Sequence, residues 1–210
     1  MELNLDTKIF EGLNSKEGIM LCGYEWGGSG SEDLFKRNQG PFTKNNYKYA
    51  NRIKTWFELW GHKIDKGGAF DKTLLQTNWC NTRSREIEGN YLDKLLADEQ
   101  VENFIYHIYS FKPRLLIFFG SVMIKILQNK KVLPRFMEIM GRKETEPLEV
   151  KRNSSFHGKK FKVSFQSFEK CNVISLPHPS GSRGLKDEYI ELFAECIGPK
   201  IQEVKRLKNI

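Results

Sequence analysis

The chain has 210 residues, a length that suits one α/β domain with a substantial core. With 39% hydrophobic and 29% charged residues, it has the composition of a globular protein and not of a disordered one. The formal net charge of +8 favours an anionic partner, nucleic acid first, although a basic surface that binds nothing is equally compatible with it.

Apolar runs and amphipathic stretches alternate along the chain. In chain order we predict a strand at 18–23, a helix at 45–61, a strand at 73–81, a helix at 91–111, a strand at 115–120, a helix at 121–131, a strand at 172–180 and a helix at 187–207. The first helix should end at Gly61, because glycine is the preferred residue just after a helix.

Buried strands that alternate with helices predict a three-layer α/β/α domain around a central, mostly parallel four-stranded sheet. In such sheets, ligands bind beyond the carboxyl ends of the strands. The predicted strands lead into GYEWGGSGS, NWCNTR, GS and PHPSGSRG, so polar and glycine-rich segments gather at one edge. We expect the functional site at this edge, in a single domain that covers residues 1–210.

The stretch at about 128–171 does not follow the alternation and is rich in lysine and arginine. We interpret it as a basic insertion. It is either a solvated excursion of the surface or a flap that contacts phosphates or covers a pocket. In the second case, Lys159 and Lys160 are residues that we expect to bind DNA.

The glycine-rich turn that follows Gly23 is of a kind that can bind phosphate at a helix N-terminus. No Gly-Lys-Ser/Thr follows it, which excludes the phosphate loop of nucleotide triphosphatases, and the dinucleotide-binding glycine spacing is also absent. The turn alone therefore does not identify a ligand.

The four cysteines are Cys22, Cys80, Cys171 and Cys196, and they lack the close pairs that chelate metals. We therefore expect no metal site, no iron–sulfur cluster and no other cofactor. The sequence begins without a signal segment, and no apolar run approaches the ~20 residues that span a membrane. These features predict a cytoplasmic protein with reduced thiols, no membrane contact and no obligate protein partner.

Five short segments, in this order, resemble the uracil-DNA glycosylase superfamily. They are GYEWG at 23–27, QGPF at 39–42, LLQTNW at 74–79, SFKPRLLIFFGSVMIKIL at 110–127 and LPHPS at 176–180. The resemblance implies the fold of that superfamily and a DNA glycosylase, a hydrolase that flips a pyrimidine out of DNA and leaves an abasic site. The iron–sulfur branch of the superfamily has an N-terminal cysteine pair, which this chain lacks.

Glu25 and His178 are the catalytic residues that this resemblance implies. Cleavage of an N-glycosidic bond produces a cation-like sugar and an anionic base. A carboxylate such as Glu25 can hold water and stabilise the cation, and a neutral histidine such as His178 can donate a hydrogen bond to the departing base. The alternatives are a solvated loop glutamate and a histidine that is merely part of a rigid proline turn.

Asn78 is the residue that the resemblance assigns to reading the base, because its amide both donates and accepts hydrogen bonds. The amide could read uracil or, turned over, cytosine, or it could bond only its own loop. Phe42 would either stack on the flipped base or lie in the core. Tyr24, Trp26 and Gly27 complete the predicted base pocket.

The segment after His178 is predicted to bind DNA through Ser180, Ser182 and Arg183. Relatives insert a bulky apolar wedge into the duplex near this point. Position 182 is a serine here, so the resemblance does not say which residue fills the gap that the flipped base leaves in the duplex.

Gly27 bears on the choice of substrate. The best-known uracil enzymes have a tyrosine near this turn that excludes 5-substituted bases, and glycine cannot exclude them. We therefore expect a 5-modified cytosine, such as the glucosylated hydroxymethylcytosine of phage DNA, as in antiviral relatives. The alternatives are a uracil-DNA glycosylase of base-excision repair, a catalytically inactive DNA-binding protein on the same fold, and an α/β enzyme that processes nucleotides or sugar phosphates.

Overall fold

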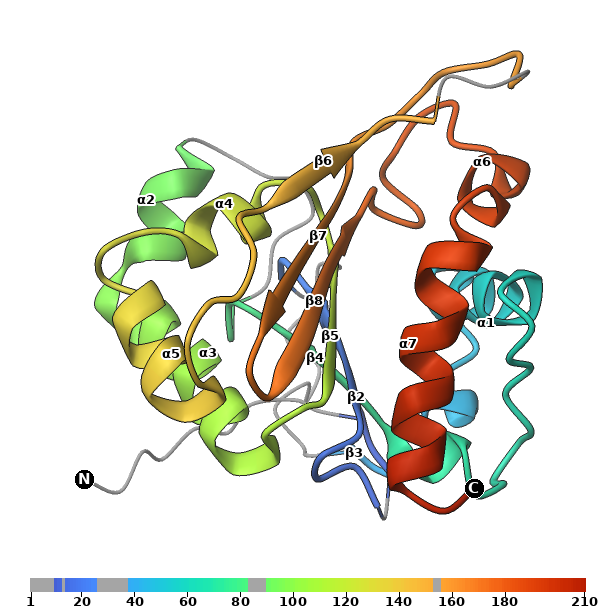
Figure 1. The fold of residues 1–210 in the computed structure, drawn as a ribbon, viewed down its shortest axis with the longest axis horizontal. Coiled ribbons are helices and arrows are strands. Elements are labelled where there is room, and N and C mark those ends of the chain that lie inside the picture. The colour runs from blue at the N-terminus through green and yellow to red at the C-terminus, as the bar shows by residue number, and fades with distance from the viewer. Residues whose placement is uncertain (1–9, 13, 26–37, 83–89, 153–155) are drawn as a thin grey trace.

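The computed structural model describes residues 10–12, 14–25, 38–82, 90–152 and 156–210 (Figure 1). The strands are β1 (Phe10–Glu11), β2 (Ile19–Gly23), β3 (Asn38–Gln39), β4 (Leu74–Asn78), β5 (Leu115–Phe119), β6 (Leu148–Val150), β7 (Val163–Phe168) and β8 (Cys171–Leu176). The α-helices are α1 (Lys48–Leu59), α2 (Tyr91–Leu96), α3 (Asp98–Phe111), α4 (Met123–Leu127), α5 (Leu133–Met140), α6 (Asp187–Glu191) and α7 (Ala194–Leu207). These elements confirm the predicted α/β class.

The strands form one mixed sheet with the order β3-β1-β4-β2-β5-β8-β7-β6. The four central strands, β4, β2, β5 and β8, are mutually parallel and correspond to the four predicted strands. The predicted strand number is wrong, because the described sheet has six strands of three or more residues and two of two residues. The additional longer strands, β7 and β6, pair antiparallel beyond β8.

The basic insertion at 128–171 is therefore partly an integral element of the sheet. It supplies α5, β6 and β7, and β7 pairs with β8 along five residue positions. Between β6 and β7, residues 151–152 and 156–162 extend past the carboxyl end of β8 as an arm beside α6 (Figure 1). Lys159 of this arm lies beside the loop after β8, near the predicted site.

Helices cover both faces of the sheet (Figure 1). Alternate residues of β2 explain how: Met20 and Cys22 pack in the cluster with α3, α4 and α5, while Ile19 and Leu21 pack in the cluster with α1, α6 and α7. Since the central strands are buried on both faces, they are almost continuously apolar, as parallel strands in this position usually are.

The register of the parallel strands brings their carboxyl ends together. Gly23 at the end of β2 lies opposite Asn78 at the end of β4, and Phe119 at the end of β5 lies opposite Leu176 at the end of β8. The segments that leave these strands therefore begin at one edge, as predicted. No helix in the described part of the chain is long and apolar enough to cross a membrane.

Candidate functional site

The loop after β8 carries His178, and the backbone of that loop determines the state of the imidazole. Nδ1 of His178 accepts hydrogen bonds from the backbone N–H groups of Gly181, at 2.8 Å, and Ser180, at 3.3 Å. A nitrogen that accepts from N–H groups carries no proton, so the neutral ring holds its proton on Nε2. Among the described residues, Nε2 has no hydrogen-bond partner, and it is left as a donor for a ligand.

Burial also keeps His178 neutral. The surrounding protein removes the imidazole from water and thereby lowers the pKa of His178 below its ordinary value of 6.5. The Tyr49 ring packs against it, with the two ring centroids 5.3 Å apart. A neutral imidazole with a directed N–H is the state that donation to a developing anion requires.

Arg52, on α1, holds the loop after β8 through hydrogen bonds to its backbone. The sequence did not reveal this residue. Its guanidinium donates to the carbonyl oxygen of Pro179 at 2.7 Å and to that of Leu185 at 2.5 Å. Its Nε donates to Oδ1 of Asp187 at 2.6 Å, and Trp56 donates its indole N–H to the same oxygen. The fork of Arg52 therefore joins both ends of the His178 loop to α1, which a lysine could not do with one ammonium.

Asn78 lies at the end of β4, with its side chain directed over β2. A Cβ placed on Gly23 would lie 2.2 Å from Oδ1 of Asn78, so the amide occupies the space that only a glycine leaves open. The side chain of Asn78 is 4% exposed, and no described residue hydrogen-bonds its amide. Its backbone carbonyl accepts from Asn103 of α3, which holds the end of the strand.

Tyr49, in the first turn of α1, reaches the same position. Its hydroxyl oxygen would be 3.4 Å from a Cβ on Gly23. The Tyr49 ring also contacts the edge of Phe119 at the end of β5. Asn78, Tyr49 and His178 therefore converge around the end of β2, although Tyr49 reads in the sequence only as one more residue of the apolar helix stripe.

Glu25 lies on the other side of this edge, in an ion pair. Its Oε1 is 2.6 Å from Nζ of Lys94, on α2, and the Glu25 side chain is only 5% exposed. This finding removes the alternative of a solvated loop glutamate. Lys94 is a second residue that the sequence did not reveal, because α2 is 69 positions away along the chain.

Tyr24 and Cys80 lie beside this ion pair. Both are buried, and burial is the main reason why the pKa of each is raised to about 12, with the negative charge of Glu25 as a further cause. They remain neutral at physiological pH. The Tyr24 hydroxyl is buried and has no hydrogen-bond partner among the described residues.

Phe42 lies in the core, which is the second of its two predicted roles. Its side chain is fully buried in the cluster beneath α1. A ring with no exposed surface does not present a face to a base. Trp26 and Gly27, the other two residues of the predicted pocket, lie outside the described residues.

The predicted DNA-binding residues gather around the loop after β8. Ser180 and Arg183 are exposed, Ser182 is half-buried, and Lys159 and Lys160 are exposed on the arm. The two segments touch, because a Cβ on Gly184 would lie 3.7 Å from Cδ of Lys159. The structure therefore brings these cations to the edge that carries His178.

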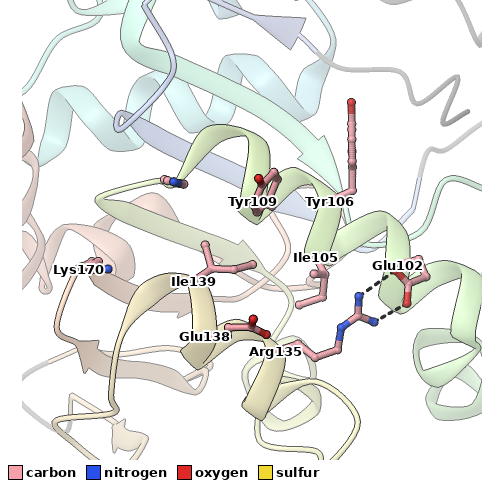
Figure 2. A pocket seen from close by; sticks show the side chains of 9 residues that line it. Glu102, Ile105, Tyr106, Tyr109, Arg135, Glu138, Ile139 and Lys170 are labelled. Carbon is pink, nitrogen blue, oxygen red and sulfur yellow. Dashed lines mark hydrogen bonds and ion pairs between the residues drawn. The ribbon is translucent and has the colours of Figure 1, made fainter. Parts of the chain in front are cut away.

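A groove of about 440 Å³ lies elsewhere, between α3 and α5 (Figure 2). Its lining includes the exposed rings of Tyr106 and Tyr109 and the ion pair between Arg135 and Glu102, whose Nη2 and Oε2 atoms are 2.8 Å apart. None of its lining residues belongs to the group of Asn78, Tyr49 and His178 around the end of β2. Among the residues described, no group of three or more His, Cys, Asp or Glu side chains could hold a metal ion.

The arrangement at the carboxyl end of the sheet thus combines an uncharged donor, a buried amide, a buried phenol and a carboxylate held by a lysine. No protein-family model matches the chain, and no curated protein sequence matches it.

Proposed function

We propose that this protein is a DNA glycosylase with the three-layer fold of the uracil-DNA glycosylase superfamily. The observation that carries the proposal is His178: its Nδ1 accepts from backbone N–H groups, so a neutral ring offers Nε2–H beyond the sheet edge. The amide of Asn78 lies near the same strand end. A flipped pyrimidine, which is planar and carries both donors and acceptors, suits such a pair of uncharged polar groups.

In the proposed reaction, the bond between C1′ of the deoxyribose and the base nitrogen breaks, and its electron pair leaves with the base. His178 donates a hydrogen bond to the base carbonyl oxygen on which this charge develops. A water molecule adds its oxygen to C1′ and loses a proton, and the base finally takes up a proton. The products are the free base and an abasic site.

Glu25 is the proposed partner of the water molecule and of the cation-like sugar. One of its oxygens is held by Lys94 at 2.6 Å, and no described residue bonds the other. That second oxygen can orient water, while Lys94 keeps the carboxylate in one position. The role agrees with the burial of Glu25, since a carboxylate acts most strongly on a cation where water is excluded.

The exposed cations beside the loop after β8 support a DNA substrate. Lys159, Lys160 and Arg183 have no ion-pair partner among the described residues, whereas Lys151 and Lys162 of the same arm pair with Glu149. Unpaired cations near a site are free to neutralise phosphates. We propose that they bind the backbone of the DNA strand that carries the target.

As substrate we propose a 5-modified cytosine, such as glucosylated hydroxymethylcytosine in phage DNA, with a role in antiviral defence. The support comes from the sequence alone: position 27 is a glycine, whereas the uracil enzymes that the chain resembles have a tyrosine near this turn that excludes 5-substituted bases. Uracil, with a role in repair, is the alternative substrate for the same side chains.

A second candidate is a DNA-binding protein without chemistry. The observation that favours it is the ion pair of Glu25, because Lys94 partly neutralises the carboxylate that the reaction needs. This candidate retains the basic arm and the base pocket and predicts salt-dependent binding without base release.

The test is a panel of matched duplex and single-stranded oligonucleotides that contain uracil, thymine, hydroxymethylcytosine or glucosylated hydroxymethylcytosine. Abasic sites are detected as alkali-labile strand breaks under single-turnover conditions. We expect cleavage at the modified cytosine. Binding to all of the DNAs without an abasic site in any would refute the glycosylase and support the second candidate.

A further inference from the structure

Tyr49 lies at the point near the end of β2 where Asn78 and His178 converge. Its ring lies between the His178 imidazole, with centroids 5.3 Å apart, and the Phe119 ring, at 5.5 Å. Its hydroxyl is directed at the end of β2, close to where a Gly23 side chain would begin and where Oδ1 of Asn78 lies. The phenol therefore reaches the space between the two proposed base contacts.

The hydroxyl of Tyr49 is buried and unsatisfied. Its oxygen has almost no exposed surface and no hydrogen-bond partner among the described residues. Buried polar atoms in native proteins are nearly always hydrogen-bonded, so an exception at a ligand site suggests that the missing partner is the ligand. Burial raises the pKa of Tyr49 well above its ordinary value of 10, so the phenol keeps its proton.

We infer that the Tyr49 hydroxyl is a further base-binding and specificity-determining group, which donates a hydrogen bond to an acceptor atom of the bound pyrimidine. This inference rests on the proposed function. It adds a third polar contact, from α1, to those of Asn78 on β4 and His178 after β8. A ligand with a carbonyl oxygen or an unprotonated ring nitrogen facing α1 satisfies the phenol, and a ligand with a donor there does not.

The ring and the hydroxyl of Tyr49 have separable effects. The ring packs against His178 and helps to position it, and Tyr49→Phe keeps that packing. The hydroxyl contacts the base in the ground state and in the transition state alike, so its loss should raise KM and leave kcat nearly unchanged. Tyr49→Leu removes the ring as well, and it should lower kcat through a misplaced His178.

The experiment compares wild type and Tyr49→Phe on the best substrate of the oligonucleotide panel. We expect kcat/KM to fall about tenfold, the usual scale for one lost hydrogen bond to a ligand, with most of the effect in KM. The melting temperature of the free protein should stay the same or rise, because the hydroxyl has no partner to lose. A fall in melting temperature, or an unchanged kcat/KM, would overturn the inference.

Two matched tyrosines serve as controls. Tyr189→Phe removes a buried hydroxyl that donates to the carbonyl oxygen of Phe161, so it should lower the melting temperature. Tyr106→Phe, on the outer face of α3, should change neither activity nor melting temperature.

Calorimetric titration of free uracil and free cytosine into wild type and Tyr49→Phe separates the two proposals. If wild type binds bases but cleaves no DNA, the glycosylase fails while a weaker affinity of the variant still supports the Tyr49 contact. If wild type neither binds nor cleaves, both proposals fail.

Discussion

The loop after β8 and the turn after β2 leave the same edge of the sheet, and they carry His178 and Glu25, yet they are held by different forces. The backbone of its own loop holds His178, and the guanidinium of Arg52 ties that loop to α1. A single ion pair with Lys94 holds Glu25 from the opposite side. One group is therefore positioned by peptide geometry and the other by charge.

This difference has a consequence for how the site works. Hydrogen bonds from backbone N–H groups to Nδ1 do not depend on ionic strength, so the donor on Nε2 is in place before any substrate arrives. The ion pair of Glu25 depends on both charges, and Lys94 is partly exposed, so salt should weaken it. We expect the position of His178 to be independent of ionic strength and the position of Glu25 to depend on it.

The largest expected effect comes from Glu25. Glu25→Gln keeps the size of the side chain but removes the charge that, in the proposed reaction, holds water and balances the sugar cation. We expect single-turnover base release to fall about a thousandfold, within the range for loss of a positioned acid or base, while DNA affinity is retained. Lys94→Met is the matched change on the other side of the pair and should reduce the rate less. Near-wild-type turnover of Glu25→Gln would remove Glu25 from the mechanism.

His178→Ala should have the next largest effect. It removes the donor to the departing base and leaves the loop tied to Arg52, so we expect base release to slow about a hundredfold or more. Fluorescence anisotropy with uncleaved DNA should show unchanged affinity. If affinity falls and the single-turnover rate does not, His178 binds the base without assisting the reaction.

A substitution at Arg52 tests whether the loop after β8 positions His178, because Arg52 touches this loop and not the proposed substrate. Arg52→Lys keeps a charge near Asp187 but cannot reach the carbonyl oxygens of Pro179 and Leu185 together. We expect kcat to fall about tenfold with KM nearly unchanged, since the histidine is less well positioned. Arg142→Lys, at an exposed pair with Glu169, is the control and should be silent. An equal fall in kcat in both variants would mean that the loss does not come from the contacts of Arg52 with the His178 loop.

The fold was largely predictable because its centre is built from buried parallel strands. A run such as 115–119 can be covered on both faces only within a helix-flanked sheet, and its neighbours share that property. The edge strand β6 was missed because Leu148 and Glu149 are exposed, and nothing local distinguishes them from a surface loop. β7 lies between β8 and β6 and is largely buried, and its alternation of Val163, Ser164, Phe165 and Gln166 is a strand pattern that was overlooked among the surrounding lysines.

The boundaries of helices were less predictable where a tertiary contact decides them. Residues 91–111 have one amphipathic pattern, yet the helix breaks at Ala97, an excellent helix former. The indole N–H of Trp79 donates to the carbonyl oxygen of Leu95 at 3.0 Å and so satisfies an acceptor at the end of α2. That bond joins residues 16 positions apart, and no propensity reveals it.

In the site, motif residues were predictable and their supports were not. Glu25, Asn78 and His178 follow strand ends, which marks them in the sequence. Arg52 and Lys94 act through partners more than 60 positions away. Tyr49 gave no separate signal, because it shares the helical spacing of the apolar residues in the predicted helix at 45–61.

The smallest expected effect is the pH dependence of stability that His178 contributes. The folded protein lowers the pKa of His178 because burial disfavours the charged ring, whereas the unfolded chain keeps a pKa near 6.5. Above pH 6.5 both states are neutral, and no dependence arises. As the pH falls through 6.5, the unfolded chain binds a proton that the folded protein does not, so the free energy of unfolding decreases. Between pH 7.5 and 5.5 the loss should be about 1 kcal/mol or less, which denaturant titrations can resolve.

The variant His178→Gln isolates this contribution, because glutamine does not titrate. His62 also has a lowered pKa through burial, and it remains in both proteins, so its effect cancels in the difference. We expect the wild type to lose more stability than the variant over this pH range, and we expect base release to persist below pH 6.5 because the folded histidine stays neutral. If the wild type instead gains stability relative to His178→Gln as the pH falls, the folded ring is charged, and its proposed role as a neutral donor held by the backbone is wrong.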